Sequence, residues 1–261
     1  MDREASVART PTITRGSRQL RNWQNFQAWI DAHSDSTWVF RGLGDVDFSL
    51  IPTIGRIPQY SLSRELSVLA SFRRRALQFA NDAGFTNWEY LALAQHHGVP
   101  TRLLDWTTNP LVAAYFAASA MPAERDVVIR RRATRATPHA SGVACRVVAT
   151  RVRHSRVVDM ESDGDPLSIS EIAFMLPRVI SNRIGSQSGL FSVHPAPDHP
   201  WLDPLEDSDH VFQIAGEDRD FFLKRLFYLG VDPLYLMGGL DGLGARAAWQ
   251  AKRGIGLGAT K

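Results

Sequence analysis

Apolar residues recur at helical spacing along much of this chain. The clearest case is residues 63–80, where leucines and alanines lie near one stripe while the three arginines that begin at Arg73 lie largely on the opposite side. Asn87 and Asn109 precede two further apolar segments and are predicted to be N-caps. The pattern predicts additional helices at residues 20–32, 88–97, 111–120, 168–176, 221–229 and 243–252.

Runs of β-branched and aromatic residues, separated by turn signals, occur mainly in the second half of the chain. They predict strands at residues 37–41, 127–130, 142–148, 153–159, 190–193 and 211–215, with loops at 43–60 and 195–204. Because most helices come first and most strands later, we expect one α+β domain in which N-terminal helices pack on a mainly antiparallel sheet. This domain is predicted to span residues 19–252, between flexible tails at 1–18 and 253–261.

Residues 95–107 concentrate polar chemistry in one short segment. Their sequence, QHHGVPTRLLDWT, holds two imidazoles, a guanidinium, a carboxylate and an indole. Gly98 and Pro100 predict that the preceding helix ends there, and Asn109 with Pro110 predicts the start of the next helix. The segment is therefore interpreted as a connector held between two helices, where side chains are accessible and still positioned by the scaffold.

Composition narrows the functional classes. No apolar run approaches the roughly 18 to 20 residues needed to span a bilayer, and residues 1–4 do not resemble a signal peptide. We therefore expect a cytoplasmic protein with no membrane partner. Cys145 is the only cysteine, predicted to be a core thiol in a strand, so an internal disulfide and a cysteine-rich zinc site are excluded. No metal site is predicted, because the adjacent His96 and His97 would point about 100° apart on a helix.

Arginine is concentrated in residues 125–156, which contain nine arginines and one acidic residue, Asp126. This stretch is a candidate anion-binding surface, although the acidic segments 159–171 and 198–220 follow it in the chain. It contains no Phe, Tyr or Trp on which the bases of a single strand would stack. Two interpretations stay open, a solvated charged face and a nucleic-acid-binding surface.

Four segments of the chain resemble motifs of the FRG domain family, in the family's order and over about residues 37–245. The long second segment is the most specific of them. The segments are Trp38-Val39-Phe40-Arg41-Gly42 with Leu50-Ile51-Pro52, residues 95–107 continuing through Asn109-Pro110 to residues 113–117, residues 182–191, and residues 229–243.

The order of these motifs also resembles that of ADP-ribosyltransferases. The resemblance implies an ADP-ribosyltransferase-like sheet core and an enzyme that cleaves the nicotinamide–ribose bond of NAD. It implies a protein or a nucleic acid as acceptor of the ADP-ribosyl group. FRG-domain proteins of this kind resemble bacterial toxins and phage-defence effectors. The sequence does not identify the acceptor, the trigger or the oligomeric state.

Under this hypothesis each functional side chain has an expected role. Arg41 would hold phosphate or ribose, since a guanidinium matches the geometry of such oxygens. Thr107 would orient Arg41, and His96 would donate a hydrogen bond to a ribose hydroxyl. Trp106 or Phe191 would stack on nicotinamide. Two further residues are expected to contact the NAD substrate: Gly42 and Arg183.

Gln187 is predicted to lie where ADP-ribosyltransferases usually carry a carboxylate. An amide orients a hydroxyl but cannot supply the negative charge that stabilises a cationic transition state. Glu89 or Glu171 is a candidate for that charge. The alternative functions are a module that binds a nucleotide or a nucleic acid without catalysis, and a protein-interaction domain without a ligand.

Architectural roles compete with these assignments. Arg102 and Asp105 lie three positions apart and form a candidate buried ion pair that would hold the connector in place. Trp106 is a candidate core residue. Removing one member of a buried ion pair costs about 3 to 5 kcal/mol, so variants at such positions lose activity by unfolding alone.

Overall fold

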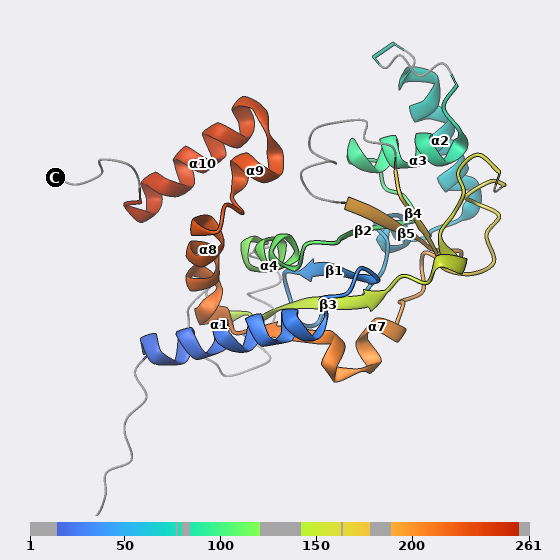
Figure 1. Ribbon diagram of the computed structural model, residues 1–261. Coiled ribbons are helices and arrows are strands. Elements are labelled where there is room, and N and C mark those ends of the chain that lie inside the picture. Colours follow the sequence, from blue (N-terminus) through green and yellow to red (C-terminus); the bar gives the residue numbers. More distant parts are fainter. Residues whose placement is uncertain are drawn as a thin grey trace, which may run out of the picture.

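The computed structural model describes residues 15–76, 78–79, 84–120, 142–162, 164–177 and 189–255 (Figure 1). Its helices are α1 (Arg15–Ala32), α2 (Leu62–Ala76), α3 (Asn87–His96), α4 (Pro110–Ser119), α7 (Asp203–Glu206), α8 (Arg219–Tyr228), α9 (Pro233–Met237) and α10 (Gly239–Arg253). Its strands are β1 (Trp38–Leu43), β2 (Leu103–Thr107), β3 (Cys145–Arg151), β4 (Ala173–Met175), β5 (Gly189–Val193) and β6 (Val211–Ile214). Short 3-10 turns lie at Ile54–Arg56, His154–Arg156, Ser208–His210 and Gly216–Asp218.

The described strands form a six-stranded antiparallel sheet in the order β4-β5-β2-β1-β3-β6. Strand β1 is in register with β3 along its whole length, and β2 with β5 along its whole length. By contrast, β1 and β2 are paired at one position, Phe40 with Thr107. The sheet therefore consists of two three-stranded halves, β4-β5-β2 and β1-β3-β6, that meet at this pair.

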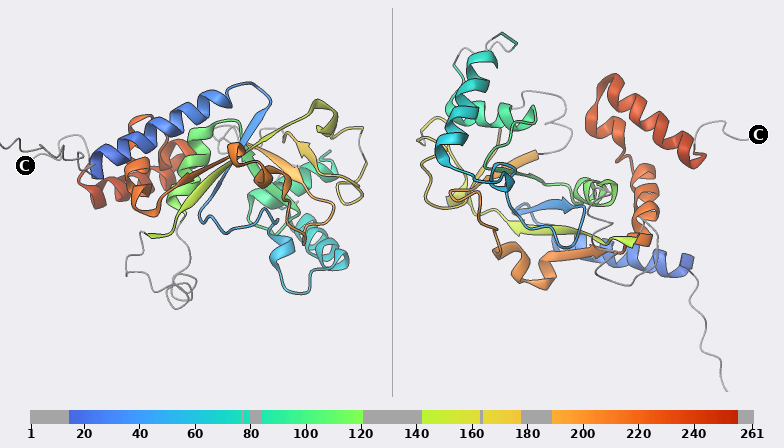
Figure 2. Two further views of the ribbon diagram at one scale, coloured as in Figure 1. Left: turned by 90° about the horizontal axis from the view of Figure 1, so that it is seen from below. Right: turned by 180° about the vertical axis from the view of Figure 1, so that it is seen from behind.

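Helices cover the two halves separately. Trp38 and Phe40 of β1 face a core built with α1, α4, α8 and α9, whereas Phe191 of β5 faces a second core built with α3. On the opposite face of the sheet, Val39 and Trp106 belong to a third core that is shared by both halves. Figure 2 shows α2 and α3 gathered at one end of the molecule and α8, α9 and α10 at the other. No helix among the described residues is long and apolar enough to cross a membrane.

The helix ends follow local capping chemistry. Asn109 caps α4 as predicted, because its side chain accepts a hydrogen bond from the backbone of Leu111. The cap of α3 is Thr86 and not the predicted Asn87: Thr86 and Glu89 form a reciprocal capping box. Helix α1 begins at Arg15, inside the range predicted as a flexible tail.

The connector prediction for residues 95–107 is wrong in one respect, because Leu103–Thr107 is a strand at the centre of the sheet. Leu103 is buried on one face of the sheet and Leu104 and Trp106 on the other. A strand buried on both faces lacks the alternation of polar and apolar residues that marks a strand with one wet face. The polar residues beside this segment also favoured its interpretation as a loop.

Two other predictions are wrong. The segment 168–176 is not a helix: it contains β4, whose edge pairing with β5 supplies the backbone hydrogen bonds. The segment 153–159 is not a strand, since it forms the turn His154–Arg156 and a single bridge from Val157 to Phe174. The strand predicted at 127–130 lies outside the described residues. Cys145 is buried in β3 as predicted, and burial raises the pKa of its thiol to about 11.

Candidate functional site

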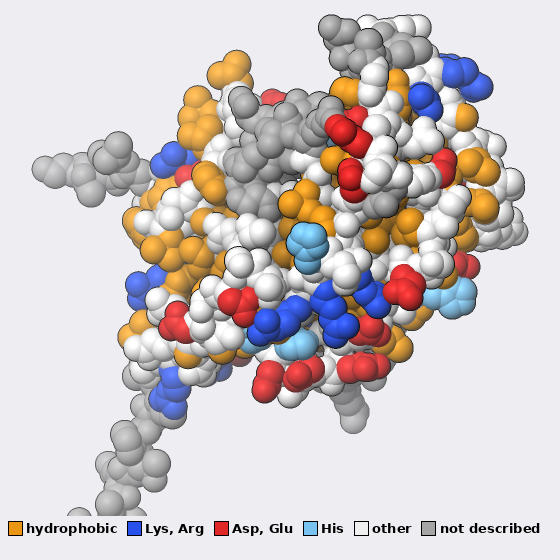
Figure 3. Space-filling view, turned by 45° about the vertical axis from the view of Figure 1, so that its right-hand side comes forward, with side chains coloured by type: hydrophobic (Ala, Val, Ile, Leu, Met, Phe, Trp, Pro, Cys, Tyr) orange, Lys and Arg blue, Asp and Glu red, His pale blue; other side chains and the backbone are white. Residues whose placement is uncertain are grey.

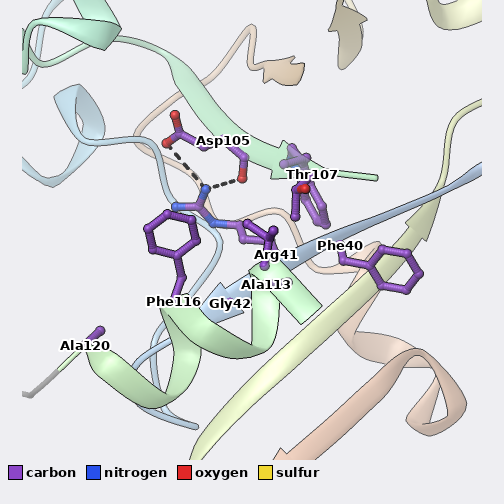
Figure 4. A pocket seen from close by; sticks show the side chains of 10 residues that line it. Phe40, Arg41, Gly42, Asp105, Thr107, Ala113, Phe116 and Ala120 are labelled. Atoms are coloured by element: carbon purple, nitrogen blue, oxygen red, sulfur yellow. Dashed lines mark hydrogen bonds and ion pairs between the residues drawn. The ribbon is translucent and has the colours of Figure 1, made fainter. Parts of the chain in front are cut away.

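A cavity of about 350 Å³ lies beside the pair that joins the two half-sheets. Strand β1 and strand β2 supply its floor, and α4 supplies one wall (Figure 4). The lining residues are Phe40, Arg41 and Gly42 from β1, Asp105, Trp106 and Thr107 from β2, Val112, Ala113 and Phe116 from α4, and Ala120 at the end of that helix. Five residues that sequence reasoning singled out, Arg41, Gly42, Asp105, Trp106 and Thr107, therefore lie together.

Arg41 reaches from β1 to β2 across the junction of the half-sheets. Its Nη1 donates a hydrogen bond to the backbone oxygen of Asp105 and lies 3.7 Å from Oδ2 of that residue (Figure 4). The Arg41 side chain is 17% exposed, and its Nε is buried without a hydrogen-bond partner among the described residues. The Nε–Nη2 edge is thus unused, and this is an edge that binds phosphate or carboxylate in a bidentate manner.

The electrostatics of Arg41 favour an additional anion. Burial lowers the pKa of Arg41, Asp105 offsets part of this effect, and the positive charge of Arg56 lowers the pKa further. Arginine stays protonated in proteins, so the lowered pKa expresses the cost of a cation that has lost water and is only partly compensated. A bound anion would supply the missing compensation.

Asp105 is held by a hydrogen-bond relay from α3. Gln95 Nε2 donates to Asp105 Oδ2 at 3.0 Å, and Thr101 Oγ1 donates to Gln95 Oε1 at 2.6 Å. The relay fixes which end of the amide faces the carboxylate. Sequence reasoning assigned no role to Gln95, because a glutamine in the last turn of a helix gives no chemical signal until β2 places Asp105 beside it.

Gly42 is required by the packing of α4 on β1. A Cβ atom at this position would collide with the backbone oxygen of Ala113 and would come within 2.5 Å of the Ala117 nitrogen. Arg219 holds the end of the same helix through hydrogen bonds to five backbone oxygens. These belong to Gly44, Ala117, Ala118, Ala120 and Val143. The α4 wall of the cavity is therefore rigidly placed, and Phe116, which sequence reasoning did not single out, projects from it.

Trp106 is positioned by a buried chain of hydrogen bonds. Its Nε1 donates to Ser192 Oγ at 2.9 Å, and Ser192 Oγ lies 2.8 Å from His194 Nε2. Burial, with the charges of Arg41 and Arg102, lowers the pKa of His194 to about 3. The imidazole is therefore neutral, and it shares a hydrogen bond with the serine hydroxyl. Trp106 both packs in the core and lines the cavity.

Arg102 pairs with Glu65 of α2, so the predicted pair between Arg102 and Asp105 is wrong. Arg102 Nε and Nη2 donate to the two Glu65 oxygens at 2.9 and 2.8 Å, and the two side chains are 1% and 0% exposed. Tyr60 donates to Glu65 Oε2 at 2.8 Å. Burial acts to lower the pKa of Arg102, but the hydrogen bonds and charge of Glu65 outweigh it and the pKa is raised. Arg102 Nη1 is buried without a hydrogen-bond partner among the described residues.

Other predicted site residues lie elsewhere. His96 ends α3 and does not line the cavity. Phe191 is paired with Asp105 but is buried in the core formed with α3, on the opposite face of the sheet from Trp106. The structure does not bring these two side chains to the cavity. Two further predicted residues, Arg183 and Gln187, lie outside the described residues.

Neither glutamate considered as a source of negative charge lines the cavity. Glu89 is buried in the capping box of α3. Glu171 is exposed and pairs with Arg156 at 3.1 Å. Among the described lining residues, the one carboxylate is Asp105.

The described part of the arginine-rich stretch is largely engaged within the protein. Arg151 pairs with Asp35 at 3.1 Å, and Arg146 donates to the backbone oxygen of Phe48 at 2.7 Å. Figure 3 shows lysine and arginine side chains interspersed with acidic ones on the face drawn there. Arginines 125 to 135 of the stretch lie outside the described residues.

Fold and cavity together define an α+β protein with an arginine at the junction of a two-part antiparallel sheet. Residues 36–126 match the family model of the FRG domain, so the chain contains an FRG domain. The match covers the first two predicted motifs, whereas the motifs at 182–191 and 229–243 lie outside it. No curated protein and no solved structure matches the chain.

Proposed function

We propose that the cavity at the sheet junction binds NAD and that the protein is an ADP-ribosyltransferase-like enzyme. The observation that carries this proposal is the unused Nε–Nη2 edge of Arg41, a poorly compensated cation beside a preformed cavity. A guanidinium edge of this kind binds the phosphate oxygens of a nucleotide more specifically than a lysine would. Arg41 lies in the first strand and Thr107 ends the second, which is the motif order expected for this class of enzyme.

The size of the cavity suits one half of a dinucleotide. Its volume of about 350 Å³ lies at the small end of the roughly 300 to 1,000 Å³ typical of small-molecule sites. The nicotinamide and its ribose would occupy the cavity beside Phe116, with a phosphate on Arg41. The adenosine half would lie outside the cavity. Arg56 would add a second positive charge near the phosphates, as its influence on the pKa of Arg41 indicates.

The chemistry explains why a site of this composition suits NAD. Cleavage of the nicotinamide–ribose bond builds positive charge on the ribose, as in glycoside hydrolysis. The protein must therefore hold the phosphate firmly, keep the ribose in one orientation and place a negative group near the developing cation. Arg41, which is anchored to β2 through the backbone oxygen of Asp105, would hold the phosphate, and the paired ends of β1 and β2 would help to orient the ribose.

The direct test follows both halves of NAD. Purified protein is incubated with NAD that carries one label in nicotinamide and another in adenosine, with and without cell lysate. We expect free nicotinamide, and transfer of the adenosine label into the protein, DNA or RNA fraction. Arg41→Gln should abolish both, whereas Arg75→Gln, which alters an exposed arginine of α2, should leave both unchanged. Protein that neither consumes NAD nor binds it in calorimetry would contradict the proposal.

A binding module without catalysis is the second candidate. Gln187, the residue predicted at the usual carboxylate position, is an amide, which favours this alternative. The same experiment separates the two functions, since a pure binding module would give a calorimetric signal with NAD but release no nicotinamide. A nucleic-acid-binding module would instead show affinity that falls steeply with salt.

A further inference from the structure

We propose that Asp105 is the catalytic carboxylate of this site and that Gln95 is its positioning residue. The inference rests on the proposed NAD chemistry and deepens it. The sequence alone predicts an architectural role for Asp105 and makes Glu89 and Glu171 candidates for the negative charge. The structure places Asp105 at the cavity and both glutamates away from it.

Asp105 presents a usable carboxylate oxygen. Its side chain is 62% exposed although its strand lies at the centre of the sheet. The contacts from Gln95 and Arg41 both go to Oδ2, and no described residue donates a hydrogen bond to Oδ1. One oxygen thus holds the group in place, while the other is available to a ligand.

The contact with Arg41 is too weak to explain Asp105 as a purely structural residue. The Nη1–Oδ2 distance is 3.7 Å, longer than a hydrogen bond, and Arg41 is bound to the Asp105 backbone oxygen in any case. Because Asp105 is well exposed and the contact is long, the pair contributes less to stability than a buried bidentate pair does. The hydrogen bond that orients the Asp105 side chain comes instead from Gln95.

Arg41 and Asp105 line the same cavity, so a single substrate molecule could contact both residues. In NAD, the nicotinamide ribose is joined to its phosphate through one methylene group and one oxygen. A phosphate bound at the Nε–Nη2 edge of Arg41 would place its ribose within the same cavity, which Asp105 also lines. The Asp105 carboxylate would accept a hydrogen bond from a ribose hydroxyl and would face the positive charge that develops on the ring.

The reaction step is balanced without any further reagent. The bond between ribose C1′ and the nicotinamide nitrogen breaks, and its electron pair stays on that nitrogen, so neutral nicotinamide leaves. Asp105 stabilises the resulting oxocarbenium ion. The oxygen of water, or a nucleophilic atom of an acceptor, then forms a bond to C1′ and loses one proton to solvent. With water the products are ADP-ribose, nicotinamide and a proton.

Gln95 acts through Asp105. Its Oε1 is held by the Thr101 hydroxyl, so its Nε2 must face the carboxylate. Removing this amide would let the Asp105 side chain rotate away from the ribose while leaving the Arg41 edge unchanged. The expected consequence is a loss of turnover with little change in NAD affinity, which differs from the effect of a residue that merely stabilises the fold.

The experiment compares Asp105→Asn, Gln95→Leu and the unmodified protein. Three quantities are measured on each: the Kd for NAD by calorimetry, kcat for nicotinamide release and the unfolding temperature. Asp105→Asn should lower kcat by about 100-fold or more and change Kd by less than about threefold. Gln95→Leu should lower kcat by about tenfold with a similarly small change in Kd.

The outcomes separate this inference from the proposed function. Suppose that the unmodified protein releases nicotinamide and that Asp105→Asn does so with the same kcat. This result would overturn the role of Asp105 but would leave the proposed function standing. If Asp105→Asn loses affinity and unfolding temperature together with kcat, Asp105 is architectural and the inference is overturned. If the unmodified protein releases no nicotinamide, both proposals fail.

Discussion

The protein contains two arginine–carboxylate pairs with opposite arrangements. Arg102 directs its Nε–Nη2 edge at Glu65, with distances of 2.9 and 2.8 Å, and both side chains are buried. Arg41 uses only Nη1 for Asp105 and leaves the Nε–Nη2 edge without a partner among the described residues. The first pair is closed by the protein itself, whereas the second is open beside a cavity.

The difference lies in the Nε–Nη2 edge of the guanidinium group, which Glu65 occupies in Arg102 and which has no partner among the described residues in Arg41. In the buried bidentate pair, Glu65 occupies the Nε–Nη2 edge of Arg102, although Nη1 has no partner among the described residues. Arg41, at the junction of the two half-sheets, contacts Asp105 through Nη1 alone and leaves its Nε–Nη2 edge without a partner among the described residues. The state of that edge is therefore a better guide to function than the burial of the arginine.

The largest expected loss of stability comes from breaking the buried pair between Arg102 and Glu65. Glu65→Ala would leave Arg102 as a buried, uncompensated cation, so we expect it to lower the free energy of unfolding by about 3 to 5 kcal/mol. Denaturant titration measures this loss. The matched change at the open pair, Asp105→Ala, should cost about 1 kcal/mol or less. Equal losses in the two variants would abolish the distinction between the pairs.

The pKa of His194 responds to the positive charges of both Arg41 and Arg102. Its pKa is lowered from 6.5 to about 3 by burial and by the charges of Arg41 and Arg102. The folded protein thus binds fewer protons than the unfolded chain between these values, so its stability is complete above pH 6.5 and falls as the pH decreases towards 3.

The matched measurement for His194 compares two pH profiles of stability. The unmodified protein should lose up to about 1.4 kcal/mol per pH unit more than His194→Gln, which cannot take up this proton. Denaturant titrations between pH 6 and pH 4 provide both profiles, within the range set by the pKa of about 3. Profiles with the same slope would mean that His194 is not held neutral by its surroundings.

A smaller loss of stability is expected from a substitution at Gly42, where β1 packs against α4 beside the cavity. Gly42→Ala would force a Cβ against α4, and overpacking of this kind costs about 1 to 3 kcal/mol. A Cβ at Gly16, in α1, would meet no atom within 4 Å, so Gly16→Ala should stabilise the helix by about 0.5 to 1 kcal/mol. Thermal unfolding of both variants tests whether Gly42 serves packing. A stable Gly42→Ala protein would show that α4 can move away from β1.

The sequence predicted much of the fold and part of the cavity. The β1 strand that carries Arg41 and Gly42 was predicted correctly, as were helix α4 and its cap Asn109. These elements carry local signals, namely a β-branched run that ends at glycine and a capping residue followed by proline. In the structure, Arg41 and the end of the 95–107 segment line one cavity.

The remaining features depend on contacts between distant positions. Strand β2 was hidden because it is buried on both faces, and β4 is a short edge strand whose pairing with β5 cannot be read from three residues. The partner of Arg102 is Glu65, which is 37 positions away in the chain. The short spacing between Arg102 and Asp105 suggested a different pair, because spacing was the only evidence that the sequence offered.

Calorimetry on two proteins tests whether the Nε–Nη2 edge of Arg41 binds NAD. Arg41→Gln removes the cation while keeping a polar side chain at the junction. We predict that NAD binds the unmodified protein and that Arg41→Gln weakens this binding by about tenfold to hundredfold. Its unfolding temperature should stay within about 2 °C of that of the unmodified protein. Equal NAD affinity in the two proteins, or no binding to either, would contradict the account.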